Sequence, residues 1–299
     1  MTQLAFVGVG NMASPMVRRF LDGDRWRLHL IDTVADRTAP FRDHPRVSIH
    51  ERLMSLPQDI DFIFLCLPNA EALRGVINEI ASRKSLGATV VVNLSTVGRQ
   101  ALSDAADALI AAGYGCVDAP VSGGAEGART GSLTVMVSGN RATVEQCSAV
   151  FDVIANKVIV IGDKPGQAQA VKVANNVLSL GALVATAEAT AITRKAGIPL
   201  DTALEALNAS SGRNSATAVK FPRHVLTGRF DFGFPTSGAL KDVSLFLELA
   251  TELGVNAPLG AAVQAIWHEA AKHGFGQQDC THIVSFYAAM AGLAEGLPA

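Results

Sequence analysis

The 299-residue sequence contains only four cysteines, which are Cys66, Cys116, Cys147 and Cys280. They are widely separated, form no Cys-x-x-Cys pair and have no histidine at the spacing of metal ligands. This pattern argues against a disulfide scaffold and against a zinc site. We therefore expect no bound metal, and we expect the protein to reside in the reducing cytoplasm.

The sequence also lacks an excess of charge of one sign, because 25 basic residues nearly balance 27 acidic ones and leave a formal net charge of −2. A protein that binds nucleic acid needs a basic surface to neutralise the phosphates, so no nucleic-acid partner is expected. Hydrophobic residues make up 49% of the chain and charged residues 17%. This composition is too apolar for intrinsic disorder and predicts a globular protein.

Signals for membrane insertion and secretion are weak. The charge-free run over residues 173–187 has 15 residues and includes Asn175, Asn176 and Gly181. It is shorter than the roughly 18 apolar residues of a membrane span. The N-terminus enters an apolar stretch at residues 4–9 without the basic lead and cleavage site of a secretory signal. We expect neither secretion nor membrane association.

The length is about twice the 150 residues of a typical domain, which favours two domains. In the first half, short β-branched runs alternate with helical stretches. Such alternation is typical of a parallel sheet with helical connections, whose strands are buried on both faces. A helix is expected over residues 12–21, and strands over residues 4–7, 27–31, 61–67, 89–94, 115–118, 133–137 and 157–161.

The pattern changes after Gly162, where Asp163-Lys164-Pro165-Gly166 is a turn signal. The remaining residues follow a helical period, with helices expected over residues 167–195, 201–209, 216–226, 238–253, 259–272 and 279–294. The sequence therefore predicts an α/β fold in two parts. Residues 1–163 form a Rossmann-type, doubly wound dinucleotide-binding domain, and residues 164–299 form an all-α substrate and oligomerisation domain.

A glycine-rich turn lies where the first strand meets the first helix. Gly8-Val9-Gly10-Asn11-Met12-Ala13 fits the Gly-x-Gly-x-x-Gly/Ala pattern. Gly8 permits a tight turn, and Gly10 lets the backbone approach a pyrophosphate, whose charge the N–H groups at the helix start can meet. Gly8, Gly10, Asn11 and Met12 are therefore candidate cofactor-binding residues, although such turns also occur for purely structural reasons.

Asp32 ends the second expected strand, 22 residues after Gly10. An acidic residue about 20 residues after the glycines binds the adenosine ribose hydroxyls in dinucleotide-binding folds. A ribose 2′-phosphate at ~4 Å would be repelled by about 1 kcal/mol per unit charge in water, so NAD is expected as the cofactor in preference to NADP. Two alternatives stay open: Asp32 could only cap the next turn, and Arg37 could reach a phosphate.

Further motifs follow in a fixed order along the chain. They are Asp118-Ala119-Pro120-Val121-Ser122-Gly123-Gly124, then Gly127 and Gly131-Ser132-Leu133-Thr134, then Gly166 with Lys172-Val173-Ala174-Asn175-Asn176, and finally Phe234 before Lys241-Asp242. Together with residues 8–16 they resemble the β-hydroxyacid dehydrogenases, a family that includes 3-hydroxyisobutyrate dehydrogenase. The resemblance covers nearly the whole chain.

The residues support the roles that this resemblance implies. Ser122 offers a hydroxyl, and successive N–H groups at Gly123 and Gly124 can form an anion-binding loop for a substrate carboxylate, unless the segment is a bare turn. Lys172 and Asn176 are four apart, so they share one helix face. Lys172 is the expected general acid/base, with its pKa lowered by burial and by the neighbouring oxidised nicotinamide, and Asn176 orients the substrate.

The resemblance alone implies further cofactor contacts by Leu67, Pro68, Thr96, Phe234 and Lys241. An aromatic and a charged residue near a helix start are common, so structural roles for Phe234 and Lys241 stay open. Residues 211–215 match a family loop but lack an aromatic that some members have, which leaves the substrate undecided.

We expect an NAD-dependent dehydrogenase of a small carboxylate substrate, with 3-hydroxyisobutyrate as the favoured 3-hydroxy acid. Alternatives are tartronate semialdehyde reduction, serine oxidation, imine reduction, or a non-catalytic dinucleotide-binding module. The Ala-rich helical part and its phenylalanines predict exposed apolar surface, and hence a homodimer or homotetramer.

Overall fold

The computed structural model describes residues 1–83 and 89–293 and divides into two compact units, Met1–Lys172 and Val173–Ala299. The division falls inside one continuous helix, α8 (Gln167–Lys195), whose bounds match those expected from the sequence. The predicted domain boundary between residues 163 and 164 lies just before this helix and stays a prediction. Each unit is described separately below.

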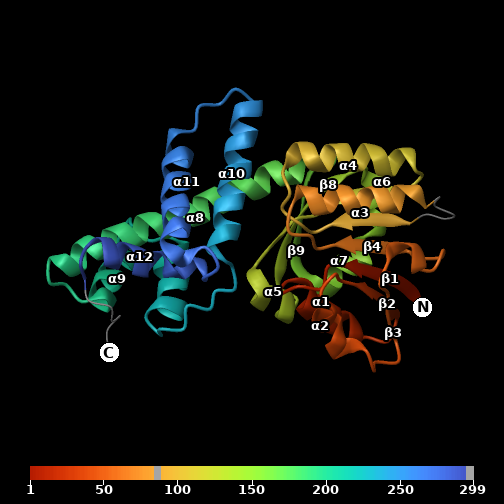
Figure 1. Ribbon diagram of the computed structural model, residues 1–299, viewed down its shortest axis with the longest axis horizontal. Coiled ribbons are helices and arrows are strands. Elements are labelled where there is room, and N and C mark those ends of the chain that lie inside the picture. Colours follow the sequence, from red (N-terminus) through yellow and green to blue (C-terminus); the bar gives the residue numbers. More distant parts are fainter. Residues whose placement is uncertain (84–88, 294–299) are drawn as a thin grey trace. The chain divides into compact units, whose positions relative to one another are not determined.

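The first unit is built around a mainly parallel sheet (Figure 1). In its described part the strand order is β3-β2-β1-β4-β5-β6-β8-β7, with β9 paired to β8. The chain moves outward from β1 in both directions, so the sheet is doubly wound, as predicted. The parallel strands of this core are β1 (Thr2–Val7), β2 (Trp26–Ile31), β3 (Val47–Ile49), β4 (Phe62–Leu65), β5 (Val90–Asn93) and β6 (Gly115–Asp118).

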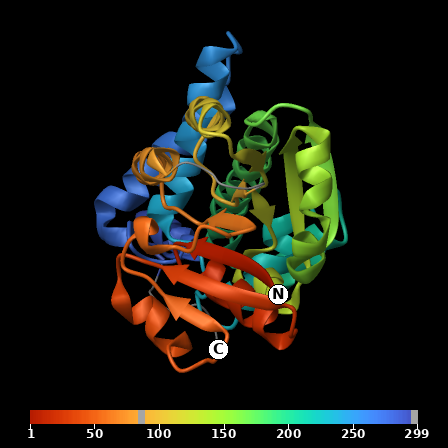
Figure 2. The same cartoon turned by 90° about the vertical axis from the view of Figure 1, so that its right-hand side faces the viewer.

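Helices cover both faces of this sheet (Figure 2). On one face α1 (Ala13–Asp22), α5 (Gly124–Thr130) and α7 (Ser148–Ile154) pack on a buried core that includes Phe6, Phe20 and Phe64. On the other face α3 (Ala70–Ser82) and α4 (Arg99–Ala111) pack on a second core. The apolar strand sequences are buried because each face has its own helical layer.

Three strands differ from the sequence expectations. β3 has three residues and β7 (Val121–Ser122) has two, which is too short for a recognisable pattern. β9 (Ala155–Gly162) forms where a strand is expected, but the expectation that it is buried on both faces is wrong. Val158, Ile159 and Val160 are 41%, 37% and 67% exposed. In the described structure β9 pairs only with β8 (Leu133–Gly139), so it lies at a sheet edge.

The described residues of the second unit form helices joined by loops, with one isolated bridge between Pro235 and Asp279 and no strand, which confirms the predicted all-α fold. Its core includes the fully buried Trp267 and Phe221. After α8 the elements are α9 (Leu200–Asn208), η3 (Ala216–Val225), α10 (Thr236–Glu252), α11 (Pro258–Ala270), η4 (Ala271–Phe275), η5 (Cys280–His282) and α12 (Ile283–Met290). The last helix ends earlier than expected, and its predicted final residue, Ala294, lies outside the described residues.

Two helical features were not expected. η3 is a π-helix that contains Pro222, whose missing backbone N–H is compatible with widened turns. By length and composition alone, α8 is apolar enough to cross a membrane, with a mean hydropathy of 1.4 over its most apolar window, of which 39% is buried. Leu180, Leu183 and Val184 of α8 belong to the core of the second unit, and a core helix passes the same test.

Candidate active site

The predicted cofactor residues of the first unit follow the ends of parallel strands. Gly8 follows β1, Asp32 follows β2, Leu67 follows β4, and Thr96 lies beyond β5. Because the carboxyl ends of parallel strands lie at one edge of the sheet, the structure brings these four segments to a common edge. This edge is where open α/β sheets bind their ligands.

The turn after β1 depends on glycine for two different reasons. Gly8 has φ of +90°, and a Cβ there would lie 2.3 Å from the backbone oxygen of Cys66 in the neighbouring strand connection. At Gly10 an added Cβ would meet no heavy atom within 4 Å, so the protein itself does not fill the space beside this backbone. Asn11 and Met12 then lead into α1. The turn therefore leaves room beside the helix start, which fits the pyrophosphate of a dinucleotide.

Asp32 organises the backbone around this turn. Its carboxylate accepts hydrogen bonds from the N–H groups of Val9 at 2.7 Å and Val34 at 2.8 Å. Arg37 forms an ion pair with it at 3.3 Å, and only 3% of the Asp32 side chain is exposed. Asp32 thus links the glycine turn to the loop after β2, so the capping role left open by the sequence is real. The same carboxylate lies at the position that binds ribose in this type of fold.

The loops after β4 and β5 are joined at their starts. The Leu67 N–H donates a 2.7 Å hydrogen bond to the Ser95 hydroxyl, which in turn donates to the Leu65 carbonyl at 3.1 Å. Pro68 and Thr96 are the next residues of the two loops. These contacts fix the backbone next to the cofactor residues that the family resemblance implies.

The proposed carboxylate loop has an unusual backbone. Ser122 pairs with Thr134 of β8 as the last residue of β7. Gly123 and Gly124 follow with φ of +131° and +65°, which side-chain-bearing residues rarely adopt. An added Cβ at Gly124 would meet no atom within 4 Å, whereas one at Gly123 would press on Leu133. The two glycines therefore permit the tight path that the backbone takes at the start of α5.

The start of α8 is held by a buried network that the sequence did not reveal. Asp118, at the end of β6, accepts hydrogen bonds from the backbone N–H groups of Gly166 and Gln169, both at 3.1 Å, and from the Gln169 side chain at 2.7 Å. The Ser138 hydroxyl donates to the same carboxylate at 3.3 Å. Burial nevertheless raises the pKa of Asp118 to about 6, against the opposing effect of these donors.

Gln169 extends this network to the loop after β5. Its side-chain oxygen accepts from the N–H groups of Val97 at 2.9 Å and Gly98 at 3.2 Å, and its amide nitrogen also donates to the Ser95 carbonyl at 3.0 Å. Lys172, three residues further along α8, is 8% exposed. The network therefore sets the position of the helical turn that carries the predicted acid/base.

On the second unit, Asn176 forms part of a charged cluster. Its side-chain amide donates a 2.6 Å hydrogen bond to Asp242, which is 2% exposed. Lys241 makes an ion pair with the same carboxylate at 3.0 Å. Asp242 therefore connects two predicted site residues, Asn176 and Lys241, and orients the Asn176 amide. In the sequence Asp242 stands out only as part of a motif, because a contact between residues 66 positions apart leaves no local pattern.

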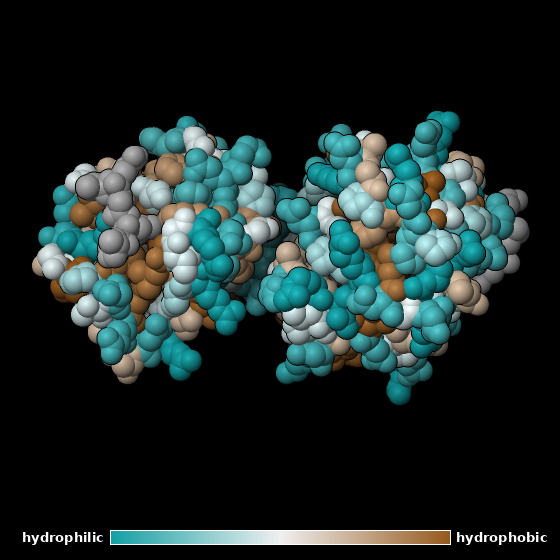
Figure 3. Space-filling view, turned by 90° about the horizontal axis from the view of Figure 1, so that it is seen from below, coloured by the Kyte–Doolittle hydropathy of each residue, from teal (hydrophilic) through white to brown (hydrophobic). Residues whose placement is uncertain are grey.

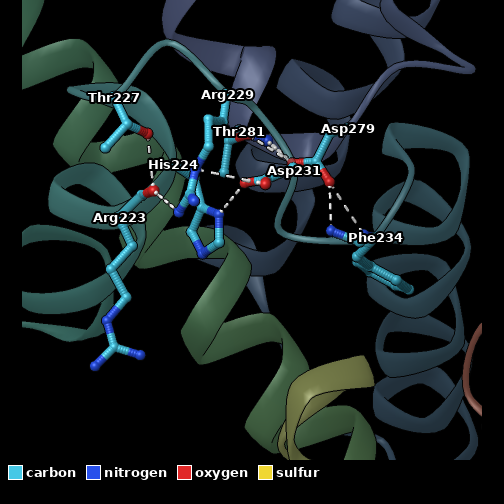
Figure 4. Close-up of polar contacts among 9 residues, drawn as sticks. Arg223, His224, Thr227, Arg229, Asp231, Phe234, Asp279 and Thr281 are labelled. Carbon is cyan, nitrogen blue, oxygen red and sulfur yellow. Dashed lines mark hydrogen bonds and ion pairs between the residues drawn. The ribbon is translucent and has the colours of Figure 1, made fainter. Parts of the chain in front are cut away.

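Phe234 lies in a loop fixed by two carboxylates (Figure 4). Asp279 accepts hydrogen bonds from the backbone N–H groups of Gly233 at 2.7 Å and Phe234 at 3.2 Å. Earlier in the loop, Asp231 pairs with the His224 ring at 2.6 Å. The Phe234 ring also packs closely on the first turn of α10, where a Cβ added at Gly238 would lie 2.9 Å from it. The aromatic ring is thus held in one place by its own loop.

The site residues fall into two sets that α8 joins. The first set, on the first unit, comprises the glycine turn, Asp32, the loops after β4 and β5, the Ser122 loop and Lys172. The second set comprises Asn176, Phe234 and Lys241. Lys172 and Asn176 are one helical turn apart on α8. A sheet edge suited to a dinucleotide, followed along the chain by a buried lysine near the start of a helix, is the arrangement of an NAD(P)-binding oxidoreductase.

Comparison with known proteins identifies the family. A model described as the NAD binding domain of 6-phosphogluconate dehydrogenase matches residues 3–162. A second, described as NAD-binding of NADP-dependent 3-hydroxyisobutyrate dehydrogenase, matches residues 166–287. The chain belongs to the β-hydroxyacid dehydrogenase family, as the sequence motifs indicate, and it is an enzyme of that class.

Similar proteins are named for several different small substrates. The chain is 30% identical to 2-(hydroxymethyl)glutarate dehydrogenase of Eubacterium barkeri, covering 98% of this chain and 97% of that protein. It is 27% identical to 3-sulfolactaldehyde reductase of Escherichia coli, covering 98% of both. The structure of Mycobacterium tuberculosis 3-hydroxyisobutyrate dehydrogenase with L-serine superimposes with a TM-score of 0.86 at 25% identity, covering 96% of this chain and 99% of that one.

Proposed function

We propose that this protein oxidises a small 3-hydroxy acid to its semialdehyde with NAD, and that 3-hydroxyisobutyrate is a substrate. The observation that carries the proposal is the buried Lys172 at a fixed point of α8, one turn before Asn176. A base must act away from bulk water to move a proton to and from a substrate hydroxyl in a controlled way. The buried position of Lys172 supports this role.

Each group has one task in the proposed reaction. Ser122, Gly123 and Gly124 bind the substrate carboxylate with a hydroxyl and backbone N–H groups. Asn176, oriented by Asp242, holds the substrate hydroxyl, and Lys172 takes the hydroxyl proton in oxidation and returns it in reduction. NAD, when bound, supplies the acceptor for the hydride that leaves the alcohol carbon.

Gly8, Gly10, Asn11, Met12 and Asp32 fit the cofactor. The open space beside Gly10 suits the pyrophosphate, and the Asp32 carboxylate suits the ribose hydroxyls. Repulsion between Asp32 and a 2′-phosphate supports NAD in preference to NADP. Arg37 weakens this preference because it neutralises part of the Asp32 charge.

The remaining cofactor contacts are proposed on the family resemblance together with the local structure. Leu67, Pro68 and Thr96 belong to loops that Ser95 fixes at the sheet edge. Phe234 and Lys241 are each held by a buried or hydrogen-bonded aspartate. These contacts hold the five residues or their loops in place, which suits cofactor binding.

We further propose a homodimer or homotetramer in the cytoplasm, with a small carboxylate as substrate and neither nucleic acid nor membrane as partner. Leu178 and Ile192 of α8 are 73% and 64% exposed. Apolar side chains lie exposed among hydrophilic ones on both units (Figure 3). Exposed apolar surface of this kind favours self-association. Light scattering during size-exclusion chromatography would test the assembly, and a monomer would contradict it.

The reaction is tested by following NADH formation with 3-hydroxyisobutyrate, glycerate, serine, 3-hydroxypropionate and 3-hydroxybutyrate, each repeated with NADP. Lys172→Ala should lower kcat by about 10²- to 10⁴-fold while NADH binding, measured by fluorescence, changes little. Lys164→Ala, at an exposed lysine just before α8, is the matched control. Undiminished turnover in Lys172→Ala would refute the mechanism, and faster turnover of glycerate or serine would replace the proposed substrate.

A further inference from the structure

The second unit contains a buried lysine that the proposed reaction does not use. Lys220, on η3, is 3% exposed. Its ammonium donates to the Ser179 hydroxyl at 2.7 Å, and it lies 3.5 Å from the Ser179 carbonyl and 3.4 Å from the Ser215 hydroxyl. It also lies 5.3 Å from the centre of the Phe232 ring. Among the described residues, no carboxylate forms an ion pair with it.

A buried cation of this kind is costly without a counterion. Hydroxyl and carbonyl oxygens and the face of an aromatic ring offset only part of the desolvation of an ammonium group. Burial accordingly lowers the pKa of Lys220, and the nearby Cys280 thiol, whose own pKa is raised, opposes this shift only when ionised. An anion bound beside Lys220 would supply the missing counter-charge.

The position of Lys220 relates it to the reaction site through α8. Lys172, Asn176 and Ser179 are spaced by four and three residues, so they lie on one face of this helix. Ser179 follows Lys172 by about 10 Å along the helix axis, at 1.5 Å per residue. The Lys220 ammonium therefore meets α8 one turn beyond Asn176, on the face that carries the proposed base.

The two serines beside the buried ammonium are more accessible than Lys220 itself. Ser215 is exposed and Ser179 is partly exposed, and both hydroxyls surround the end of the Lys220 side chain. Three polar groups from α8, η3 and the preceding loop thus converge at one point. A cation and two hydroxyls form a suitable binding site for a carboxylate or sulfonate.

We propose that Lys220, with Ser179 and Ser215, binds a second anionic group of the substrate, carried on the carbon next to the carboxylate. The proposal rests on the proposed function, and it makes 3-hydroxy acids with an acidic side arm the preferred substrates over 3-hydroxyisobutyrate. 3-Hydroxyisobutyrate has only a methyl group at this place and would leave Lys220 without a counterion. An acid with a two-carbon arm ending in a carboxylate or sulfonate would supply that counterion.

The test compares two substrates in two variants. In the wild type, kcat/KM for 2-(hydroxymethyl)glutarate should exceed that for 3-hydroxyisobutyrate by about 10- to 100-fold, the value of one or two charge-assisted hydrogen bonds. Lys220→Met should lower this ratio of kcat/KM values to about one, while kcat/KM for 3-hydroxyisobutyrate stays nearly unchanged. Lys195→Met, at an exposed lysine of α8, is the matched control and should keep the ratio. Equal losses for both substrates in Lys220→Met would show a structural role and overturn the proposal.

A second variant guards against misfolding of Lys220→Met. Ser215→Asp, at an exposed position, places a carboxylate beside Lys220 as an internal counterion and should also abolish the ratio. Retention of the full ratio in Ser215→Asp would contradict the proposal.

A binding measurement separates this proposal from the proposed function. Titration calorimetry with 2-methylglutarate, isobutyrate and a sulfonate analogue of the glutarate needs no turnover. Tighter binding of the two dianions, lost in Lys220→Met, supports the anion site even if the wild type oxidises none of the acids. A preference for one dianion identifies its terminal group as carboxylate or sulfonate. Equal binding of 2-methylglutarate and isobutyrate by the wild type would refute the site.

Discussion

Replacement of Gln169 should give the clearest test of how much the buried network at the start of α8 stabilises the first unit. Its side chain is fully buried and makes four hydrogen bonds, three of them in buried surroundings. Gln169→Met keeps the length of the side chain and removes all four hydrogen bonds. The Val97 N–H would then lack a partner in a dry environment. The Ser95 carbonyl would keep only the hydrogen bond from the Asn93 amide, and the Asp118 carboxylate would lose the shortest of its hydrogen bonds.

The magnitude follows from the cost of such groups. Each buried donor or acceptor left without a partner costs about 1–3 kcal/mol. The Val97 N–H without a partner and the two further lost hydrogen bonds, one of them to a charged carboxylate, should together lower the free energy of unfolding of the first unit by about 3–6 kcal/mol, after allowance for the apolar surface that methionine buries. That loss is comparable with the whole stability of many domains, which is about 5–15 kcal/mol. Urea denaturation followed by circular dichroism would measure it as a lower midpoint.

The effect should also depend on pH. The pKa of Asp118 is already raised to about 6, so its ionised form costs stability as the pH rises through this value. Gln169 donates the shortest hydrogen bond to that ionised carboxylate. The loss in Gln169→Met should therefore be larger above pH 6 than below it. Gln100→Met, on the exposed side of α4, is the control. A shift smaller than about 1 kcal/mol, or one equal to the control, would refute the reasoning.

Three further predictions concern the first unit. Gly8→Ala should lower the thermal midpoint and weaken NADH binding, since its Cβ would clash with the Cys66 carbonyl at 2.3 Å and φ is +90°; a normal melting curve would contradict this. His29, hydrogen-bonded to His50 at 2.9 Å, has its pKa lowered to about 4 by burial, so stability should fall as the pH decreases from about 6.5 towards 4. In His29→Leu this decline, measured by urea denaturation at several pH values, should be shallower, and an unchanged slope would exclude His29 as its source. Asp32→Ser should raise kcat/KM with NADP relative to NAD by about tenfold or more, because it removes charge repulsion; an unchanged ratio would argue against a ribose contact.

The sequence predicts local structure well where local patterns determine it. The bounds of α8 match because its apolar period is uninterrupted from the turn at Gly166 to the exposed end of the helix. The π-helical geometry of η3 was not predicted, because it depends on Pro222 and on packing. β9 was expected to be buried because its sequence is apolar, although burial depends on whether a neighbouring element covers it.

The same limit applies to the site. The glycine turn and Asp32 could be found because their spacing follows from the strand-turn-helix geometry. The roles of Gln169 and Lys220 could not be predicted, because each depends on hydrogen-bond partners that are 51 and 41 residues away, respectively. A charged or amide residue in a helical period predicts an exposed face, and only the fold shows that both side chains are buried.

Because α8 is continuous, a single helix carries both the residue proposed to transfer the proton and, further along, a residue proposed to select the substrate. Lys172 lies in a turn whose placement is determined by Asp118 and Gln169, whereas Ser179 lies two turns later among residues that contact η3. Mutations around position 179 can therefore alter which acid is accepted without moving the proton-transferring amine. Divergence within such a protein can proceed stepwise, with new substrates acquired at one end of the helix while the chemistry at the other end is inherited unchanged.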